Sequence, residues 1–322
     1  MTMAETKLAA DDVQPAIEKL KSLRDGDIGV VEAVACGQHA IPALHALLFE
    51  REPSGIYQPR CWAARALSIL GAYDILFEFL STPHEARDPV ERAGDDAVIN
   101  AAARQLSVVR EERVFQLLLG LARRRNWPGV IAALAAFHRK EAIPYLVDAL
   151  AEDDCRLLAE PALVSFGRAA LPALLRCATL RSPSASVGSE TSIRKRRSAL
   201  SLLMEIGVPR DLWPSLRDLV LDREPRIAVL ACEFCFSVAP EAEWSDATHR
   251  LIGLLEHADW RLESDVEECL VRHYRKVSHV VAAMLREKAG AREEPAPPWS
   301  REVLLRVRAR GDPRERRARK GP

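Results

Sequence analysis

Apolar residues in this sequence recur with the 3.6-residue period of an α-helix, and the clearest stretches begin at a proline. Leucine stands two residues after Pro42, Pro144, Pro172 and Pro214, and small or apolar residues follow at the fifth and sixth positions after each. This spacing places the apolar side chains along one stripe of a helix. We therefore predict a helix with one buried face at each of these four prolines.

Glycines lie close to these corners, and nearly the same phrase occurs twice in the chain. Residues 37–48 read GQHAIPALHALL and residues 167–178 read GRAALPALLRCA. Glycine suits the left-handed turn that ends a helix, whereas proline is tolerated in the first turn of the next helix. We predict tight corners between antiparallel helices at four glycines: Gly37, Gly71, Gly167 and Gly207.

Alanine-rich helical segments precede the corners, as in residues 60–71, 130–137 and 196–207. The starts of successive second helices are 28 to 42 residues apart, which is typical of stacked helical hairpins. We predict an all-α fold in which a lone helix at about residues 13–24 precedes roughly eight antiparallel pairs, up to residue 289. Residues 82–96 are expected to form a loop between the second and third pairs. Residues 290–322 are expected to open with a Pro-rich linker, to contain one possible amphipathic stretch at Trp299–Arg308, and to end as a basic, largely disordered tail.

These pairs resemble short HEAT-like repeats of the phycobilisome-lyase type, within the armadillo-type α-solenoids. The matching residues are Arg60, Ala63 and Ala64 through Gly71; Arg156 and Ala159 through Gly167 to Pro172; Arg196 through Gly207; and Asp222, Pro225, Ile227 and Ala231. The resemblance implies a superhelix in which the arginine of one repeat bonds to its neighbour. It also suggests a lyase- or chaperone-like role in modifying a partner protein. Because Ile99 and Ala228 replace the arginine in two pairs, we expect that series of contacts to be interrupted.

Charge and composition limit the classes of function that this chain can have. The chain has 46 basic and 46 acidic residues, but residues 290–322 hold ten of the basic and five of the acidic ones. Residues 1–289 are therefore net acidic, which disfavours a large contact with phosphate backbones. No apolar run approaches the roughly 20 residues of a membrane span, and the N-terminus lacks the apolar segment of a secretion signal. Seven cysteines in helical segments favour a reducing cytoplasm.

Candidate catalytic chemistry is sparse. Cys232-x-x-Cys235 could begin a zinc or redox site, and Cys269 with His273 could share a metal, but no further ligand motif accompanies them. Buried cysteine as a small apolar residue is the alternative that we favour. The chain also lacks phosphate-binding glycine motifs and nucleophile elbows. We predict no catalytic residue, no cofactor and no metal.

Basic residues cluster in three places. Two clusters are Arg123, Arg124 and Arg125 with Trp127, and Arg194, Lys195, Arg196 and Arg197; the third extends from Arg306 to Lys320. Arginines next to a tryptophan could contact phosphate and stack on a base. A solvated surface is the more common explanation of the first two clusters, whereas the tail carries a stronger local field. Nucleic-acid binding through the tail is thus the second candidate function.

Polar positions on the second helices suggest the leading function. Those outside the apolar stripe are Tyr145, Asp148, Glu152, Arg176, Asp218 and Asp222, with Glu78 and His45 as further members. In a superhelix such positions align into an extended groove that suits a helix or an unfolded segment of another protein. A plain solvated face is the alternative. We predict a cytoplasmic, non-catalytic scaffold that binds a partner protein.

Overall fold

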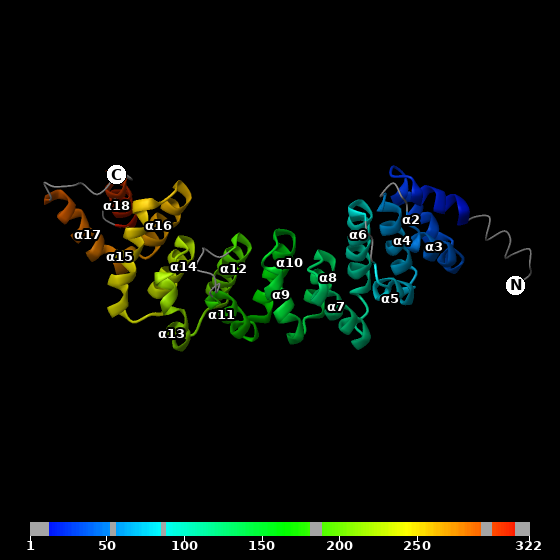
Figure 1. Ribbon diagram of the computed structural model, residues 1–322, viewed down its shortest axis with the longest axis horizontal. Coiled ribbons are helices and arrows are strands. Elements are labelled where there is room, and N and C mark those ends of the chain that lie inside the picture. The colour runs from blue at the N-terminus through cyan, green and yellow to red at the C-terminus, as the bar shows by residue number, and fades with distance from the viewer. Residues whose placement is uncertain (1–12, 52–55, 85–87, 181–188, 291–297, 313–322) are drawn as a thin grey trace, which may run out of the picture. The chain divides into compact units, whose positions relative to one another are not determined.

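The computed structural model describes residues 13–51, 56–84, 88–180, 189–290 and 298–312, and it consists of helices joined by turns (Figure 1). No strand occurs among these residues, so the fold is all-α, as the sequence predicts. The chain forms two compact units, Met1–Phe166 and Gly167–Pro322. The boundary between them therefore falls at one of the predicted glycine corners, whereas residue 290 lies inside the second unit.

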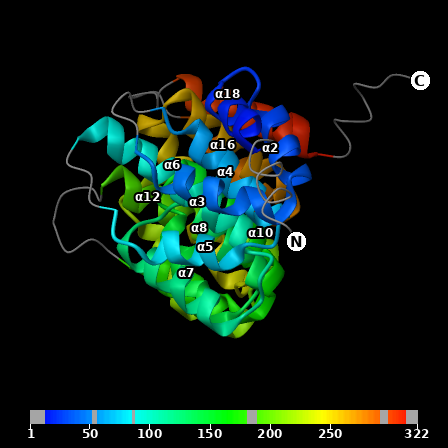
Figure 2. The ribbon, with the colours of Figure 1, turned by 90° about the vertical axis from the view of Figure 1, so that its right-hand side faces the viewer.

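In the first unit, first and second helices of successive pairs alternate along the chain. The first helices are α2 (Gly26–Ala35), α4 (Gln58–Ile69), α6 (Pro89–Leu106), α8 (Pro128–Phe137) and α10 (Asp153–Phe166); the second helices are α3 (Ile41–Phe49), α5 (Tyr73–Ser81), α7 (Glu112–Arg124) and α9 (Ile143–Ala149). Each first helix packs on the next first helix, and the second helices contact one another in the same order. Figures 1 and 2 show α5 and α7 on the opposite side of this unit from α4 and α6.

The second unit follows the same alternation. Its first helices are α12 (Glu190–Ile206), α14 (Pro225–Val238) and α16 (Trp260–Arg272); its second helices are α11 (Leu171–Thr179), α13 (Trp213–Leu216), α15 (Trp244–Leu254) and α17 (Tyr274–Gly290). A last helix, α18 (Pro298–Gly311), packs on both α16 and α17. Because α12 packs on α14 and α14 on α16, α18 takes the place of the first helix of a further pair.

Four corners combine a residue of positive φ with a proline in the first turn of the next helix, whereas α5, which follows Gly71, begins without a proline. Four glycines have positive φ angles: Gly37 (59°), Gly71 (74°), Gly167 (55°) and Gly207 (86°). No atom lies within 4 Å of a Cβ built on any of them, so backbone conformation rather than space favours glycine. The prolines in the first turns of α3, α9, α11 and α13 are Pro42, Pro144, Pro172 and Pro214. In the corner after α8 the left-handed residue is His138, whose ring stacks on Phe166 at 4.3 Å.

The N-terminal helix spans residues 13–21, three residues fewer than predicted. It buries Val13, Ala16, Ile17 and Leu20, which follow one helical stripe. Its backbone lies so close to α2 that a Cβ on Gly29 would come within 2.7 Å of the Leu20 amide nitrogen. The helix thus covers the outer side of the first pair and takes the role of a terminal cap.

Residues 82–96 do not form one long loop, because α6 begins at Pro89. The Asp88 carboxylate accepts hydrogen bonds from the backbone N–H groups of Val90 (2.7 Å) and Glu91 (3.2 Å). An aspartate N-cap followed by proline is a strong helix start, and the polar residues after it masked the helical pattern. As a result Asp95 lies within α6, where it is only 2% exposed.

Within the predicted linker and largely disordered tail, residues 298–311 form α18, a helix that contains the amphipathic stretch Trp299–Arg308. Val303, Leu304 and Val307 form an apolar stripe on this helix and are fully buried. Residues 291–297 and 313–322 lie outside the described part of the chain.

Candidate partner-binding surface

The second-helix face is our name for a set of polar side chains on α3, α5, α7 and α9. Its members are His45, Glu78, Arg123, Tyr145 and Asp148, all at least partly exposed. His45 Nε2 lies 3.5 Å from Glu78 Oε2, which joins α3 to α5. Arg123 Nε donates a 2.9 Å hydrogen bond to the Tyr145 hydroxyl, which joins α7 to α9. Two contacts of this face therefore join neighbouring second helices, one between α3 and α5 and one between α7 and α9.

The Arg123–Tyr145 contact leaves hydrogen-bonding capacity for a partner. A tyrosine hydroxyl can accept one hydrogen bond and still donate its own hydrogen, so Tyr145 offers a donor beside the exposed carboxylate of Asp148. Glu152 extends this face toward α10, and one of its carboxylate oxygens accepts a 3.2 Å hydrogen bond from Asn126 Nδ2. Tyr145, Asp148 and Glu152 are thus brought together in the first unit, as an acidic, hydrogen-bonding surface.

The other three predicted groove residues lie in the second unit. Arg176 on α11 and Asp218 in the 3-10 helix Arg217–Leu221 are exposed. Asp222, however, is 8% exposed and forms a 2.5 Å ion pair with Arg196, while its other oxygen accepts the Glu224 N–H at 3.0 Å. The prediction of Asp222 as a partner-binding residue is therefore wrong, because both of its oxygens are used inside the unit.

The first basic cluster is largely paired with acceptors of its own unit. Arg125 forms a 2.5 Å ion pair with one oxygen of Asp96. The other oxygen accepts a 2.7 Å hydrogen bond from the indole N–H of Trp127. Trp127 is 8% exposed, so its ring cannot stack on a base as proposed from the sequence. Arg124 remains exposed at the end of α7.

The second basic cluster also departs from a simple surface patch. Arg196 is 9% exposed and donates through Nε to the Ala178 carbonyl at 3.0 Å, in addition to its pair with Asp222. Arg194 lies 3.3 Å from Glu190, one turn earlier on the same helix. Lys195 and Arg197 are half-buried. The prediction that Arg196 belongs to an accessible basic patch is wrong, since helix packing buries it.

The tail arginines that the structure describes are engaged as well. On α18, Arg306 pairs with Glu263 and Glu267, and Arg310 pairs with Glu267. These pairs neutralise part of the positive field on which the nucleic-acid interpretation depends. The five basic residues from 314 to 320 lie outside the described residues.

The cysteines behave as buried apolar side chains. Cys232, Cys235 and Cys269 are each at most 2% exposed, and burial raises the pKa of the Cys235 thiol to about 12. Burial also raises the pKa of Cys232 and Cys269 well above the usual range for a thiol. None of the seven cysteines, all of which lie in the described part of the chain, forms a disulfide bond. In the described part of the chain, no group of three histidine, cysteine or acidic side chains is arranged to hold a metal ion.

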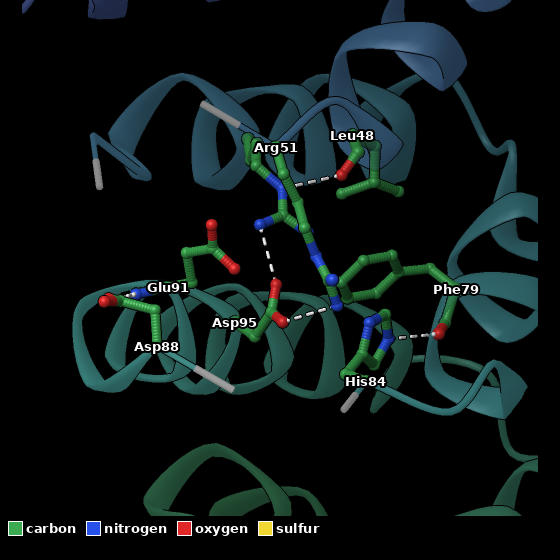
Figure 3. A network of polar contacts seen from close by, with 8 residues as sticks. Leu48, Arg51, Phe79, His84, Asp88, Glu91 and Asp95 are labelled. Atoms are coloured by element: carbon green, nitrogen blue, oxygen red, sulfur yellow. Dashed lines mark hydrogen bonds and ion pairs between the residues drawn. The ribbon is translucent and has the colours of Figure 1, made fainter. Parts of the chain in front are cut away.

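A buried ionic cluster in the first unit joins Arg60, the arginine that the repeat resemblance expects to bond a neighbouring pair, to Asp95, which the sequence analysis did not single out. Asp95 lies between Arg51 (2.7 Å) and Arg60 (2.9 Å), and Arg60 also donates to the Leu48 carbonyl at 2.9 Å (Figure 3). His84 lies beside this cluster and hydrogen-bonds the Phe79 carbonyl at 2.8 Å. The Asp88-Pro89 helix start is the signal that would have placed Asp95 within α6. Because every charged group in this cluster has a partner, we assign it a structural role.

No protein-family model matches this sequence, and a comparison with curated proteins also finds no match. Among the described residues, no single helix has the length and apolarity to cross a membrane, although residues 153–169 and 171–179 meet that criterion when taken together.

Proposed function

We propose that this protein is a non-catalytic scaffold, built as an α-solenoid of HEAT-like helix pairs, that binds another protein through the second-helix face of its first unit. The contact between Arg123 and Tyr145 carries the proposal, because it joins two successive second helices while both side chains stay exposed. A surface continuous across repeats is what extended repeat proteins use to bind partners. The free state of the cysteines agrees with a cytoplasmic location.

The chemistry of this face favours a partner segment with basic and apolar side chains. Glu78, Asp148 and Glu152 supply carboxylates, and Tyr145 supplies an aromatic ring with a hydrogen-bond donor. Tyrosine is among the residues that contribute most at protein interfaces, and opposite charges orient the partner. We therefore expect binding that weakens as the salt concentration rises.

An affinity purification with quantitative mass spectrometry tests this function. The bait is the full-length chain, compared with Tyr145→Ala/Asp148→Lys. The matched control is Arg176→Glu/Asp218→Lys, which changes exposed residues of the second unit. We expect a specific protein that is retained by the wild type and the control but reduced at least tenfold with the first variant. A partner retained equally by all three baits would contradict the proposed face.

The nucleic-acid alternative finds less support, because Trp127 is buried and Arg306 and Arg310 are paired with glutamates. No observation favours a lyase- or chaperone-like role over simple binding. Nuclease treatment during the same purification tests the nucleic-acid alternative, because a partner that is bridged by nucleic acid would then be lost.

A further inference from the structure

The last helix of the chain packs on its unit through three kinds of contact. The first is apolar: Val303, Leu304 and Val307 of α18 are fully buried where the helix meets α16 and α17. Figure 1 shows α18 beside these two helices. The surface of α16 and α17 that α18 covers is called the α16–α17 face below.

The second contact is ionic and comes from the same side of the helix. Arg306 Nε donates to Glu267 at 2.8 Å, and the same guanidinium also bonds Glu263. Arg310, one turn later, bonds the other oxygen of Glu267. Glu267 is only 7% exposed. Burial raises the pKa of this carboxyl, but the hydrogen bonds from both arginines outweigh that effect and hold the pKa below its usual value. The ion pairs from α18 therefore stabilise the charged form of this buried glutamate.

The third contact is a close backbone approach at the end of the helix. A Cβ on Gly311 would lie 2.3 Å from Cγ of Tyr274, at the start of α17. Such a distance is far below van der Waals contact, so any larger residue at this position would push α18 away from α17. The face therefore requires a small residue where the docked helix ends.

These contacts define a recognition pattern. Counting from the first buried valine, the face takes apolar residues at positions 1, 2 and 5, arginines at positions 4 and 8, and glycine at position 9. We propose that the α16–α17 face is a binding site for an amphipathic helix of this pattern in a partner protein, and that α18 is an internal ligand that occupies it. Protein surfaces usually recognise a bound helix through side chains that lie about one turn apart along it.

The stacked architecture explains why this face needs an occupant. Each helix pair buries its apolar stripe only against its neighbours, so the last pair of a stack leaves a stripe that another helix must cover. α18 provides that cover in the position of a further first helix. A partner helix with the same apolar and arginine positions would satisfy the same buried carboxylate.

The connection to α17 makes α18 a strong competitor. Seven residues, 291–297, join the two helices, and a short linker gives an effective concentration on the order of 1 mM. A partner helix of equal affinity at about 1 μM would then occupy roughly one site in a thousand. The face is therefore closed until the docking of α18 is weakened.

The test uses full-length protein and a fluorescein-labelled peptide of residues 298–312. Arg306→Glu places a negative charge against Glu263 and Glu267 and should release α18 while leaving the face intact. Fluorescence anisotropy should then show at least tenfold tighter peptide binding to this variant than to the wild type. A peptide that carries Arg306→Glu itself should bind the variant at least tenfold more weakly than the wild-type peptide does.

Two further variants make the result decisive. Arg301→Glu is the matched control on an exposed position of α18 and should leave the face closed. Gly311→Leu should open it without changing any charge. Hydrogen–deuterium exchange reports whether residues 300–311 are released. If exchange in Arg306→Glu equals that of the wild type, or if a released α18 leaves the face unable to bind the wild-type peptide, the proposal is overturned.

Discussion

Arg60 in the first unit and Arg196 in the second occupy matching places in their helix pairs. Each donates through Nε to a backbone carbonyl of the preceding second helix, Arg60 to Leu48 at 2.9 Å and Arg196 to Ala178 at 3.0 Å. Both carbonyls belong to the sixth residue after the proline of that helix. Each arginine then forms an ion pair with an aspartate further along the chain.

The two aspartates are held differently. Asp95 lies inside α6 and accepts from two guanidinium groups, those of Arg51 and Arg60 (Figure 3). Asp222 precedes α14; its carboxylate accepts from one guanidinium and from the backbone N–H of Glu224, while its backbone carbonyl accepts from Arg250 at 3.2 Å. The first unit thus compensates its buried carboxylate with two cations, whereas the second uses one cation and one neutral donor. Both sets of contacts involve an ionised carboxylate and are charge-assisted, so the two units differ in the number of cations that the carboxylate meets.

Other pairs show that this arginine contact is not uniform. Arg156 stays half-exposed and pairs with Asp153 (3.0 Å) and Glu160 (3.8 Å) of its own helix. Where Ala228 replaces the arginine, Arg250 from α15 donates to the backbone carbonyl of Val220 at 3.3 Å. A neighbouring helix therefore supplies a guanidinium for the carbonyl that the missing arginine would have bonded.

The largest expected effect comes from neutralising the two aspartates. Asp95→Asn leaves two guanidinium groups facing an amide and should lower the free energy of unfolding by about 3–5 kcal/mol. Asp222→Asn loses one charged contact and should cost about 2–3 kcal/mol. Urea unfolding followed by circular dichroism measures both, and Asp27→Asn, at an exposed pair, serves as the control. Equal losses at the two buried positions would show that the second cation contributes nothing.

Removing the arginines should reverse that order with a smaller effect. Arg196→Met leaves the Asp222 carboxylate with only the Glu224 N–H, so we expect a loss of about 3 kcal/mol. Arg60→Met leaves Asp95 paired with Arg51, and the expected loss is about 2 kcal/mol. The same unfolding experiment applies, with the exposed Arg65→Met as control. The comparison fails if Arg60→Met is the more destabilising of the two.

The smallest effect concerns pH and one histidine in each unit. Burial, with Lys276 and Arg272 nearby, lowers the pKa of His273 to about 4. Burial also lowers the pKa of His84, although the Phe79 carbonyl and Asp95 oppose that shift. A histidine whose pKa is lower in the folded state makes its full contribution to the free energy of unfolding above its unfolded-state pKa of about 6.5. That contribution is lost as the pH falls toward the folded-state pKa.

We therefore expect the free energy of unfolding to fall by about 1 kcal/mol between about pH 6.5 and pH 5 because of His273, allowing for solvent screening. His273→Gln should remove that part of the pH dependence, and His84→Gln should remove less. Urea midpoints at about pH 7 and about pH 5 provide the measurement. A larger change for His84→Gln would mean that its environment penalises the charged ring more than that of His273.

Prediction from the sequence succeeded where neighbours along the chain decide the structure. Helices, corners and the first-turn prolines follow from periodicity and from the conformations that glycine and proline favour. It failed where a partner lies far away in the sequence. Trp127 and Asp96 are 31 residues apart, and Arg196 and Asp222 are 26 residues apart. A run of arginines in the sequence therefore predicts a surface patch, and only the packing of distant helices shows which of these arginines is buried.

The last helix, α18, likewise has one property that depends on nearby residues and another that depends on distant ones. Its amphipathic stripe is visible in the sequence, but the glutamates that fix its orientation lie about 40 residues earlier, on a different helix.

By itself, then, the sequence determined that this chain is helical and where its helices turn, because backbone preferences act over a few residues. Only the tertiary structure decided which charged side chains are enclosed, which remain on the second-helix face, and which helix covers the last pair. Burial and ion pairing arise when helices far apart in the chain pack together, and their free energies depend on that environment rather than on residue type alone.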